Sequence, residues 1–209
     1  MTDSRLQVFV VDDDESVCRA LGRLIKSAGY CVETFGSASA FLDRVQAYTC
    51  PACVVLDIQL PDLNGLELQR ELDATLPIVF ITGHGDISMT VDAMKAGATD
   101  FLPKPVRDTD LLRAVEQALE RAVQAYTIQC ELDAIHCRLG RLTPREREVM
   151  ALVVTGRLNK QVAGDLGTVE KTIKAHRARV MAKMEVTSLA QLVRVADRIG
   201  LGAPADMHS

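Results

Sequence analysis

The chain of 209 residues contains no tryptophan, and aromatic residues make up only 4% of it. It also lacks a long apolar run, because stretches such as residues 52–56 have the length of a buried strand and cannot span a bilayer. The N-terminus has no basic segment followed by an apolar core, which argues against a secretory signal peptide. We therefore expect a cytoplasmic protein that makes no membrane contact.

The cysteines do not follow a metal-binding pattern. Cys50 and Cys53 have CxxC spacing, yet neither a second pair nor a histidine cluster accompanies them. We interpret the six cysteines mainly as small apolar residues, with a redox or metal-binding role as the alternative. They are Cys18, Cys31, Cys50, Cys53, Cys130 and Cys137.

The two halves of the chain differ in the sign of their net charge. The overall net charge is −4, but residues 1–121 carry a net −8 and residues 122–209 a net +4. An acidic half beside a basic half suggests two domains, the second of which faces a polyanion.

Apolar runs of strand length alternate with amphipathic stretches over the first 120 residues. This alternation predicts a five-stranded, doubly wound parallel sheet of the α/β class. The predicted strands are residues 6–11, 30–35, 52–57, 77–82 and 99–102. Active sites of such sheets lie at the carboxyl ends of the strands.

From Asp108 onward the pattern is helical only, which predicts an all-α second part. A stretch reaching to about Leu142 has apolar residues at alternating steps of three and four, so it either pairs with a twin helix or packs on its own domains. This seam consists of Ala125, Ile128, Leu132, Ile135, Leu139 and Leu142. Thr143 and Glu146 then form a capping box around Pro144, where a new domain begins. Its predicted helices are residues 143–155, 159–166, 170–184 and 188–199.

Acidic and phosphate-compatible residues follow the predicted strands. Asp12–Asp14 come after the first strand, Asp57 ends the third, Thr82 ends the fourth and Lys104 follows the fifth. Clustered carboxylates repel unless a cation joins them, and oxygen ligands suit Mg²⁺. A lysine, a hydroxyl and a metal around one carboxylate can orient phosphoryl oxygens, so that the carboxylate acts as a nucleophile. Asp14 alone is better explained as a solvated loop acid.

Residues 5–121 resemble the receiver domain of bacterial response regulators throughout. The matching segments are VVDDD (10–14), LDIQLPDLNG (56–65), ITGHGD (81–86) and AMKAGATDFLPKP (93–105). The resemblance implies a flavodoxin-like fold and the following roles. Asp57 would be the phospho-acceptor. Mg²⁺ or Mn²⁺ would be held by Asp13, Asp57 and the backbone carbonyl of Gln59, with Asp12 acting indirectly. Phosphate binding and switching would belong to Lys104, Thr82 and Phe101. The Lys104–Pro105 bond is often cis in this family.

Two features qualify the resemblance. Thr82 lies only 25 positions after Asp57, fewer than is usual in the family, which predicts a short third helix near residues 66–74. Phosphatases with an aspartyl nucleophile place a second aspartate two residues further on, where this chain has Gln59, which cannot transfer protons at neutral pH. We therefore expect a switch with at most slow autodephosphorylation, and not an enzyme.

Residues 141–196 resemble the LuxR/NarL-type helix-turn-helix. Together the two resemblances indicate a response regulator of the NarL/FixJ type. The segment GHGD (83–86) favours the FixJ-like branch. The matching segments are LTPREREV (142–149), NKQVAGDLG (159–167) and TIKAHRARVMAKM (172–184). In the helix 170–184, Ile173, Val180 and Met184 should face the core, whereas small and cationic residues can enter the major groove. The predicted DNA-binding residues are Lys171, Thr172, Lys174, Ala175, His176, Ala178, Arg179 and Lys183. Val169 is a poor N-cap, so either Thr168 caps this helix one residue early or its amides stay open to a DNA phosphate.

The sequence thus predicts a receiver domain (5–121), a helical linker (122–140) and a DNA-binding domain (141–203). The expected partners are a sensor histidine kinase, double-stranded DNA with inverted-repeat sites, a second copy of the chain on activation and, as a further option, RNA polymerase. Two other hypotheses remain: a phosphotransfer or protein-interaction module whose C-terminal part binds protein, and a cysteine-based redox regulator.

Overall fold

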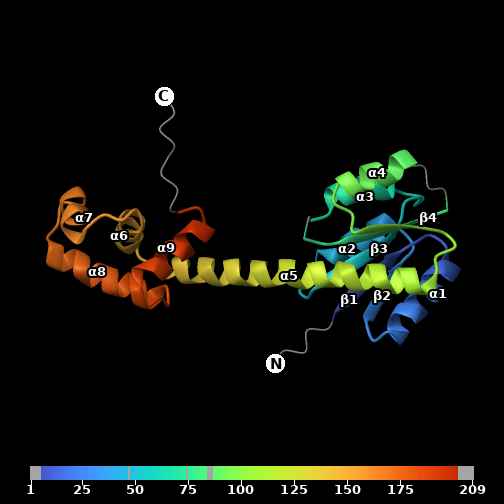
Figure 1. The fold of residues 1–209 in the computed structure, drawn as a ribbon, viewed down its shortest axis with the longest axis horizontal. Coiled ribbons are helices and arrows are strands. Elements are labelled where there is room, and N and C mark those ends of the chain that lie inside the picture. The colour runs from blue at the N-terminus through green and yellow to red at the C-terminus, as the bar shows by residue number, and fades with distance from the viewer. Residues whose placement is uncertain (1–5, 47, 74, 84–86, 202–209) are drawn as a thin grey trace. The chain divides into compact units, whose positions relative to one another are not determined.

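The computed structural model describes residues 6–46, 48–73, 75–83 and 87–201. Contacts divide the chain into two compact units, Met1–Thr127 and Ile128–Ser209. The first is α/β and the second is helical (Figure 1). In the described part of the chain, no helix combines the length and apolar character that a membrane span needs.

The first unit contains a parallel five-stranded sheet with the order β2-β1-β3-β4-β5. The doubly wound fold that the alternating pattern predicted is confirmed, and each predicted strand agrees with the structure to within one residue at either end. The strands are β1 (Gln7–Val11), β2 (Cys31–Phe35), β3 (Ala52–Asp57), β4 (Ile78–Thr82) and β5 (Asp100–Pro103).

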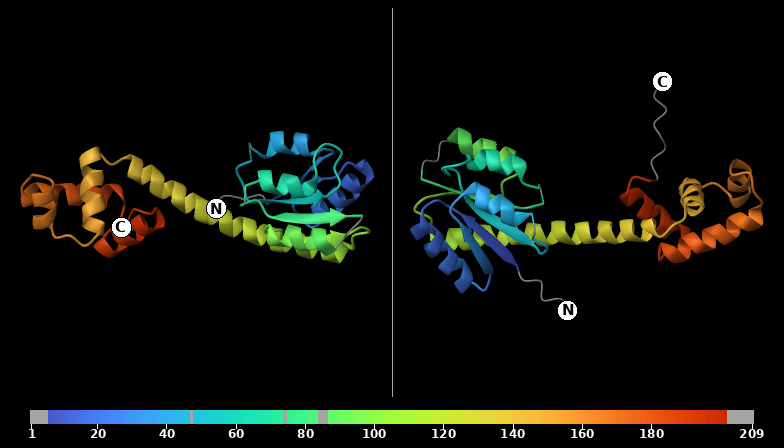
Figure 2. Two further views of the ribbon diagram at one scale, coloured as in Figure 1. Left: turned by 90° about the horizontal axis from the view of Figure 1, so that it is seen from above. Right: turned by 180° about the vertical axis from the view of Figure 1, so that it is seen from behind.

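Helices cover both faces of this sheet, as the two further views show (Figure 2). Alternate strand residues point to opposite faces, so Val55 packs in one core with helices α1 and α5, and Val54 packs in the other with α2, α3 and α4. The helices are α1 (Glu15–Ser27), α2 (Ala38–Val45), α3 (Gly65–Glu71), α4 (Ile87–Lys95) and α5 (Asp108–Gly140). Helix α3 has only seven residues, which confirms the short third helix.

The second unit consists of α6 (Pro144–Val154), α7 (Asn159–Asp165), α8 (Glu170–Lys183) and α9 (Leu189–Arg198), together with the end of α5. The capping box predicted at Thr143 and Glu146 is present, and Gly156 and Gly167 end the helices before them with positive φ angles of 83° and 60°. Ile173, Val180 and Met184 are buried, as predicted for the core side of α8.

The residues of the predicted apolar seam on α5 differ in their burial. Ile135 and Leu142 are buried in the core of the second unit, and Leu139 packs against it. Ile128, by contrast, is 60% exposed. The C-terminal half of the seam is therefore occupied by the chain's own packing.

The predicted domain boundaries stay predictions. The division between the two units falls inside α5, within the predicted linker of residues 122–140. Residues 5, 84–86 and 202–203, to which the predictions also extended, lie outside the described residues.

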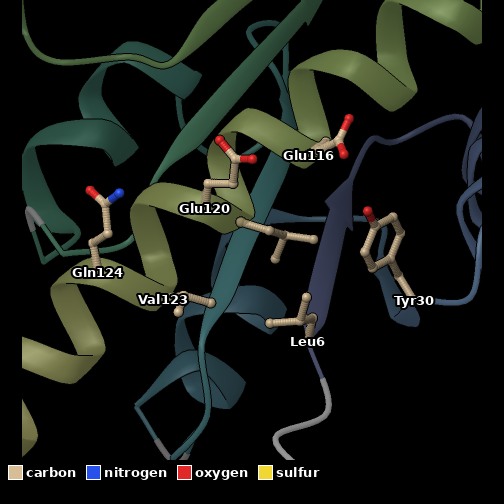
Figure 3. A pocket seen from close by; sticks show the side chains of 7 residues that line it. Leu6, Tyr30, Glu116, Glu120, Val123 and Gln124 are labelled. Carbon is tan, nitrogen blue, oxygen red and sulfur yellow. The ribbon is translucent and has the colours of Figure 1, made fainter.

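A hollow of about 600 Å³ lies at the amino end of β1, against α5 (Figure 3). Leu6, Tyr30 and Leu119 are among its apolar lining residues, and Glu116 and Glu120 also line it. Because Asp12 and Asp13 follow the carboxyl end of β1, this hollow lies away from them.

Candidate functional site

Three carboxylates meet at the carboxyl edge of the sheet. Asp12 and Asp13 follow β1, and Asp57 is the last residue of the neighbouring strand β3. One carboxylate oxygen from each residue lies within 4.8 Å of one oxygen from each of the other two. Asp12 is 0% and Asp57 5% exposed, whereas Asp13 is open to solvent. An oxygen-only donor set of this kind fits a hard divalent cation such as Mg²⁺.

Lys104 joins two of these carboxylates. Its Nζ donates hydrogen bonds of 2.6 Å to Oδ2 of Asp12 and 2.6 Å to Oδ2 of Asp57. The backbone amide of Lys104 donates to the carbonyl of Thr82 at 2.7 Å, and the Lys104–Pro105 peptide bond is cis. The loop after β5 thus holds a cation against the residue that ends β3.

Burial and charge pairing act together on this pocket. Burial raises the pKa of Asp12 above its ordinary value, although the hydrogen bond from Lys104 opposes this rise. For Lys104, burial lowers the pKa, but the hydrogen bonds to Asp12 and Asp57 outweigh it and raise the pKa overall. Lys104 therefore remains cationic at neutral pH, ready to face the oxygens of an anion.

The backbone around Asp57 depends on a glycine whose role the sequence did not reveal. Gly65 donates a backbone hydrogen bond of 2.8 Å to the carbonyl of Ile58. A Cβ atom at position 65 would lie 2.6 Å from the carbonyl oxygen of Asp57 and 2.9 Å from Cα of Ile58, both of which are backbone atoms. Only glycine permits this close approach, so Gly65 fixes the turn that carries Gln59 past the carboxylate.

Thr82 and Phe101 lie on the neighbouring strands β4 and β5. Thr82 ends β4 and is 1% exposed, and its register partner on β5 is Pro103. Phe101 is partly buried, with its ring centroid 6.4 Å from that of Phe80. The strand order therefore places Thr82 on the strand next to the one that carries Asp57, and Phe101 one strand further out, where its register partner is Phe80.

Asp14 stands apart from the acidic cluster. Its side chain accepts a hydrogen bond of 2.7 Å from the amide of Ser16 and caps α1. This bond lowers the pKa of Asp14. Asp14 is thus exposed, as expected of a loop acid, but it has a structural task that the sequence analysis did not assign.

Several basic residues of the second unit lie on the exposed side of α8. Lys171, Lys174 and Arg179 are exposed, with Ala175 and Ala178 between them, whereas Thr172 and His176 are half-buried. Lys174 also forms an exposed ion pair of 3.0 Å with Glu170. Small residues between cations leave room for close approach to a polyanion.

Helix α8 begins without a side-chain cap. Its N-cap residue is Val169, which cannot accept a hydrogen bond through its side chain, and the helix does not start early at Thr168. Of the two alternatives left open by the sequence, the structure therefore favours open amides at this end of α8.

Lys183, also predicted to bind DNA, has a partner in its own unit. Its Nζ lies 2.7 Å from Oε2 of Glu146, a carboxylate that is only 3% exposed. The same oxygen accepts a hydrogen bond of 2.9 Å from the amide of Thr143. Glu146 thus links the start of α6 to the end of α8, a contact between distant segments that the capping pattern alone did not indicate.

We expect acidification to weaken this link. The hydrogen bonds from Lys183 and Thr143 hold the pKa of Glu146 below its ordinary value of 4.5. Its stabilising effect is therefore complete above pH 4.5 and is lost as the pH falls through the lower pKa of the folded state. At pH 7, Glu146→Gln should reduce the protection of α6 and α8 amides against hydrogen exchange by about 1–3 kcal/mol.

Hydrogen exchange of the full chain, corrected for intrinsic rates, measures this effect. The matched control is Glu148→Gln, because Glu148 forms an exposed pair with Arg145 on the same helix. The difference between wild type and Glu146→Gln should shrink as the pH falls below about 4.5. A difference that stayed constant with pH would show that the charge of Glu146 is not what links the helices.

Comparison with known proteins identifies the two units. The pattern of the response regulator receiver domain matches residues 8–116, and that of bacterial regulatory proteins of the luxR family matches residues 141–196. The chain belongs to the response regulators. It combines a receiver domain with a LuxR-type DNA-binding domain, which confirms the family and the fold expected from the sequence.

Relatives of this response regulator match it over almost its whole length. It is 43% identical over 202 residues to the response regulator protein TmoT of Ectopseudomonas mendocina, covering 95% of this chain and 91% of TmoT. It is 42% identical over 205 residues to the transcriptional regulatory protein FixJ of Rhizobium meliloti, covering 97% and 99%. Among solved structures, the response regulator StyR is 46% identical with a TM-score of 0.80, covering 93% of this chain and 99% of StyR.

Proposed function

We propose that this response regulator accepts a phosphoryl group on Asp57 from a sensor histidine kinase and thereby controls its binding to promoter DNA. The observation that carries the proposal is the position of Lys104, whose Nζ lies 2.6 Å from both Asp12 and Asp57. A cation held against a nearly buried carboxylate, next to further oxygen ligands, suits phosphoryl transfer to that carboxylate.

In the transfer step, a carboxylate oxygen of Asp57 attacks the phosphorus of the donor phosphohistidine. The O–P bond forms as the P–N bond breaks, and the imidazole nitrogen keeps the electron pair. Asp13, Asp57 and the carbonyl of Gln59 would hold Mg²⁺ or Mn²⁺, with Asp12 acting indirectly, and the metal would neutralise phosphoryl oxygens. Lys104 would then turn toward the phosphoryl group, and Thr82 and Phe101 would adjust beside it.

The product should persist as a signal. Hydrolysis of the acyl phosphate needs a group that transfers protons to and from water. Gln59, two residues beyond Asp57, carries an amide that cannot do this at neutral pH. We therefore propose a regulator and not a turnover enzyme.

The proposed DNA surface is the exposed side of α8. Lys174, Ala175 and Ala178 would meet base edges in the major groove, and Lys171, Thr172 and Arg179 would lie near phosphates. Ala178 can contact a thymine methyl but donates no hydrogen bond. Because Glu146 already engages Lys183, and Nδ1 of His176 is buried without a hydrogen-bond partner among the described residues, we give these two a supporting role.

We further propose that the protein acts in the cytoplasm, where its DNA lies, and that phosphorylated chains form a two-fold dimer on inverted repeats. RNA polymerase is a further proposed partner at such promoters.

Phosphorylation should either pair two chains or raise the DNA affinity of each chain by itself. Light scattering and DNA titration before and after treatment with acetyl phosphate separate these routes. Pairing makes affinity depend on protein concentration, whereas release of an inhibited chain raises affinity without a change in mass. If neither mass nor affinity changed in fully phosphorylated protein, the coupling would be refuted.

A further inference from the structure

The loop between β3 and α3, residues 58–64, is joined near its tip to a helix that lies earlier in the chain. The exposed side chain of Asp62 accepts hydrogen bonds from the backbone amides of Ala38 at 3.1 Å and Ser39 at 2.9 Å, the first two residues of α2. These bonds, the one from Ser39 most strongly, lower the pKa of Asp62, so its carboxylate is anionic at neutral pH. Asp62 thus anchors the loop that follows Asp57.

Helix α2 needs the carboxylate of Asp62 at its N-terminus. The first amides of a helix have no acceptor within the helix itself. The N-cap Ser37 accepts a hydrogen bond of 3.3 Å from the amide of Ala40, and the two amides before it donate to Asp62. The helix dipole also favours a negative charge at this end. Hydrogen bonding and electrostatics therefore both hold the loop in one position.

The same loop carries Gln59, whose backbone carbonyl is the proposed third metal ligand. The amide of Gln59 donates to Oδ1 of Asp57 at 3.2 Å, and Gln59 forms an isolated antiparallel bridge with Asn64. Among the described residues, none donates a hydrogen bond to the carbonyl of Gln59, so this oxygen is open to a cation. Gly65 closes the base of the loop and Asp62 fixes its tip, so the direction of the carbonyl depends on both.

The contact of Asp62 reaches past the strand that leads to the acidic cluster. Strand β1 lies between β2 and β3, α2 follows β2, and the loop follows β3. Asp13 comes after β1 at the same edge of the sheet. A shift of the loop would therefore change the separation between the carbonyl of Gln59 and the carboxylates with which it would share a cation.

We propose that Asp62 is a positioning residue for the metal ion: by fixing the loop on α2, it holds the carbonyl of Gln59 toward the site formed with Asp13 and Asp57. Asp62 is not itself a ligand in this arrangement and acts only through the loop. The inference rests on the proposed metal-assisted phosphorylation and adds a residue outside the acidic cluster. Replacing a group that orients a metal ligand lowers metal affinity about 10–100-fold.

The test is a Mg²⁺ titration of the unphosphorylated full-length protein, followed by its amide NMR signals. Asp62→Ala should raise the dissociation constant for Mg²⁺ about ten-fold. Asp62→Asn, which keeps one acceptor oxygen, should raise it less. The matched control is Asp73→Ala, because Asp73 is an exposed aspartate that accepts a 2.8 Å hydrogen bond from the amide of Thr75 in the loop after α3. This control should bind Mg²⁺ as wild type does.

Two further measurements separate positioning from damage to the fold. In Asp62→Ala, the amides of Ala38 and Ser39 should exchange hydrogen faster than in wild type, because they lose their acceptor. Labelling by acetyl phosphate at saturating Mg²⁺ should still reach the wild-type level, because Asp57 and the other ligands are unchanged. A loss of labelling that saturating Mg²⁺ did not restore would overturn the inference, since it would indicate a damaged pocket.

The remaining outcomes are also decisive. Unchanged Mg²⁺ affinity in Asp62→Ala, together with faster exchange at Ala38 and Ser39, would show that the anchor does not position Gln59. Equal losses of affinity in Asp62→Asn and Asp62→Ala would assign the effect to the charge of Asp62 and would overturn the inference as well. Failure of the wild-type protein to bind Mg²⁺ would instead refute the proposed metal site, and the inference with it.

Discussion

Asp57→Asn is expected to abolish phosphorylation of this response regulator by acetyl phosphate in the presence of Mg²⁺, whereas each wild-type chain takes up a single phosphoryl group. Asparagine has nearly the shape of aspartate, so the pocket should stay intact, but its amide is no nucleophile toward phosphorus. Intact-mass spectrometry measures the uptake directly. The loss should be complete, because the proposed chemistry assigns the new O–P bond to this side chain alone.

A matched control is Asp43→Asn, because Asp43 is an exposed residue of α2 away from the pocket and carries the same change. It should be labelled as fully as wild type. Replacement of Asp13, the exposed member of the cluster, should raise the Mg²⁺ concentration that labelling requires. Undiminished labelling of the Asp57→Asn protein would refute the assignment of the acceptor.

DNA binding by the phosphorylated dimer is expected to weaken about 10³–10⁴-fold when monovalent salt rises from about 50 to 200 mM. The estimate assumes that each protomer neutralises about three to four phosphates, which corresponds to a log–log slope of about −5 to −7. Lys174→Ala should cost about 1–3 kcal/mol per site if the lysine reads a base, and less if it meets only phosphate. In the phosphate case the slope should also become shallower.

Fluorescence anisotropy with a selected genomic site, over a series of salt concentrations, measures both effects. Lys26→Ala is the control, because Lys26 is an exposed cation at the end of α1 in the receiver domain. It should leave both affinity and slope unchanged. A log–log slope near zero would show that DNA is not the partner and would favour a C-terminal domain that binds protein.

The sequence by itself determined the two-domain organisation and the members of the acidic pocket. Strand-length apolar runs identify the parallel sheet, and such a sheet brings the ends of its strands to one edge. Asp12, Asp57 and Lys104 could therefore be grouped before their distances were known, although 92 residues separate Asp12 from Lys104. The capping box at Thr143 and Glu146 depends only on nearby residues, so it too could be predicted from the sequence.

Only the tertiary structure decided which partner each side of a helix contacts. The spacing of Ile135 and Leu142 fits a coiled coil and a domain core equally well, and packing in the second unit selected the core. In the same way, the chemistry of Lys183 allows a phosphate or a carboxylate partner, and the fold supplies Glu146. Periodicity and residue type are properties of one segment, whereas these choices depend on which distant segment lies opposite it.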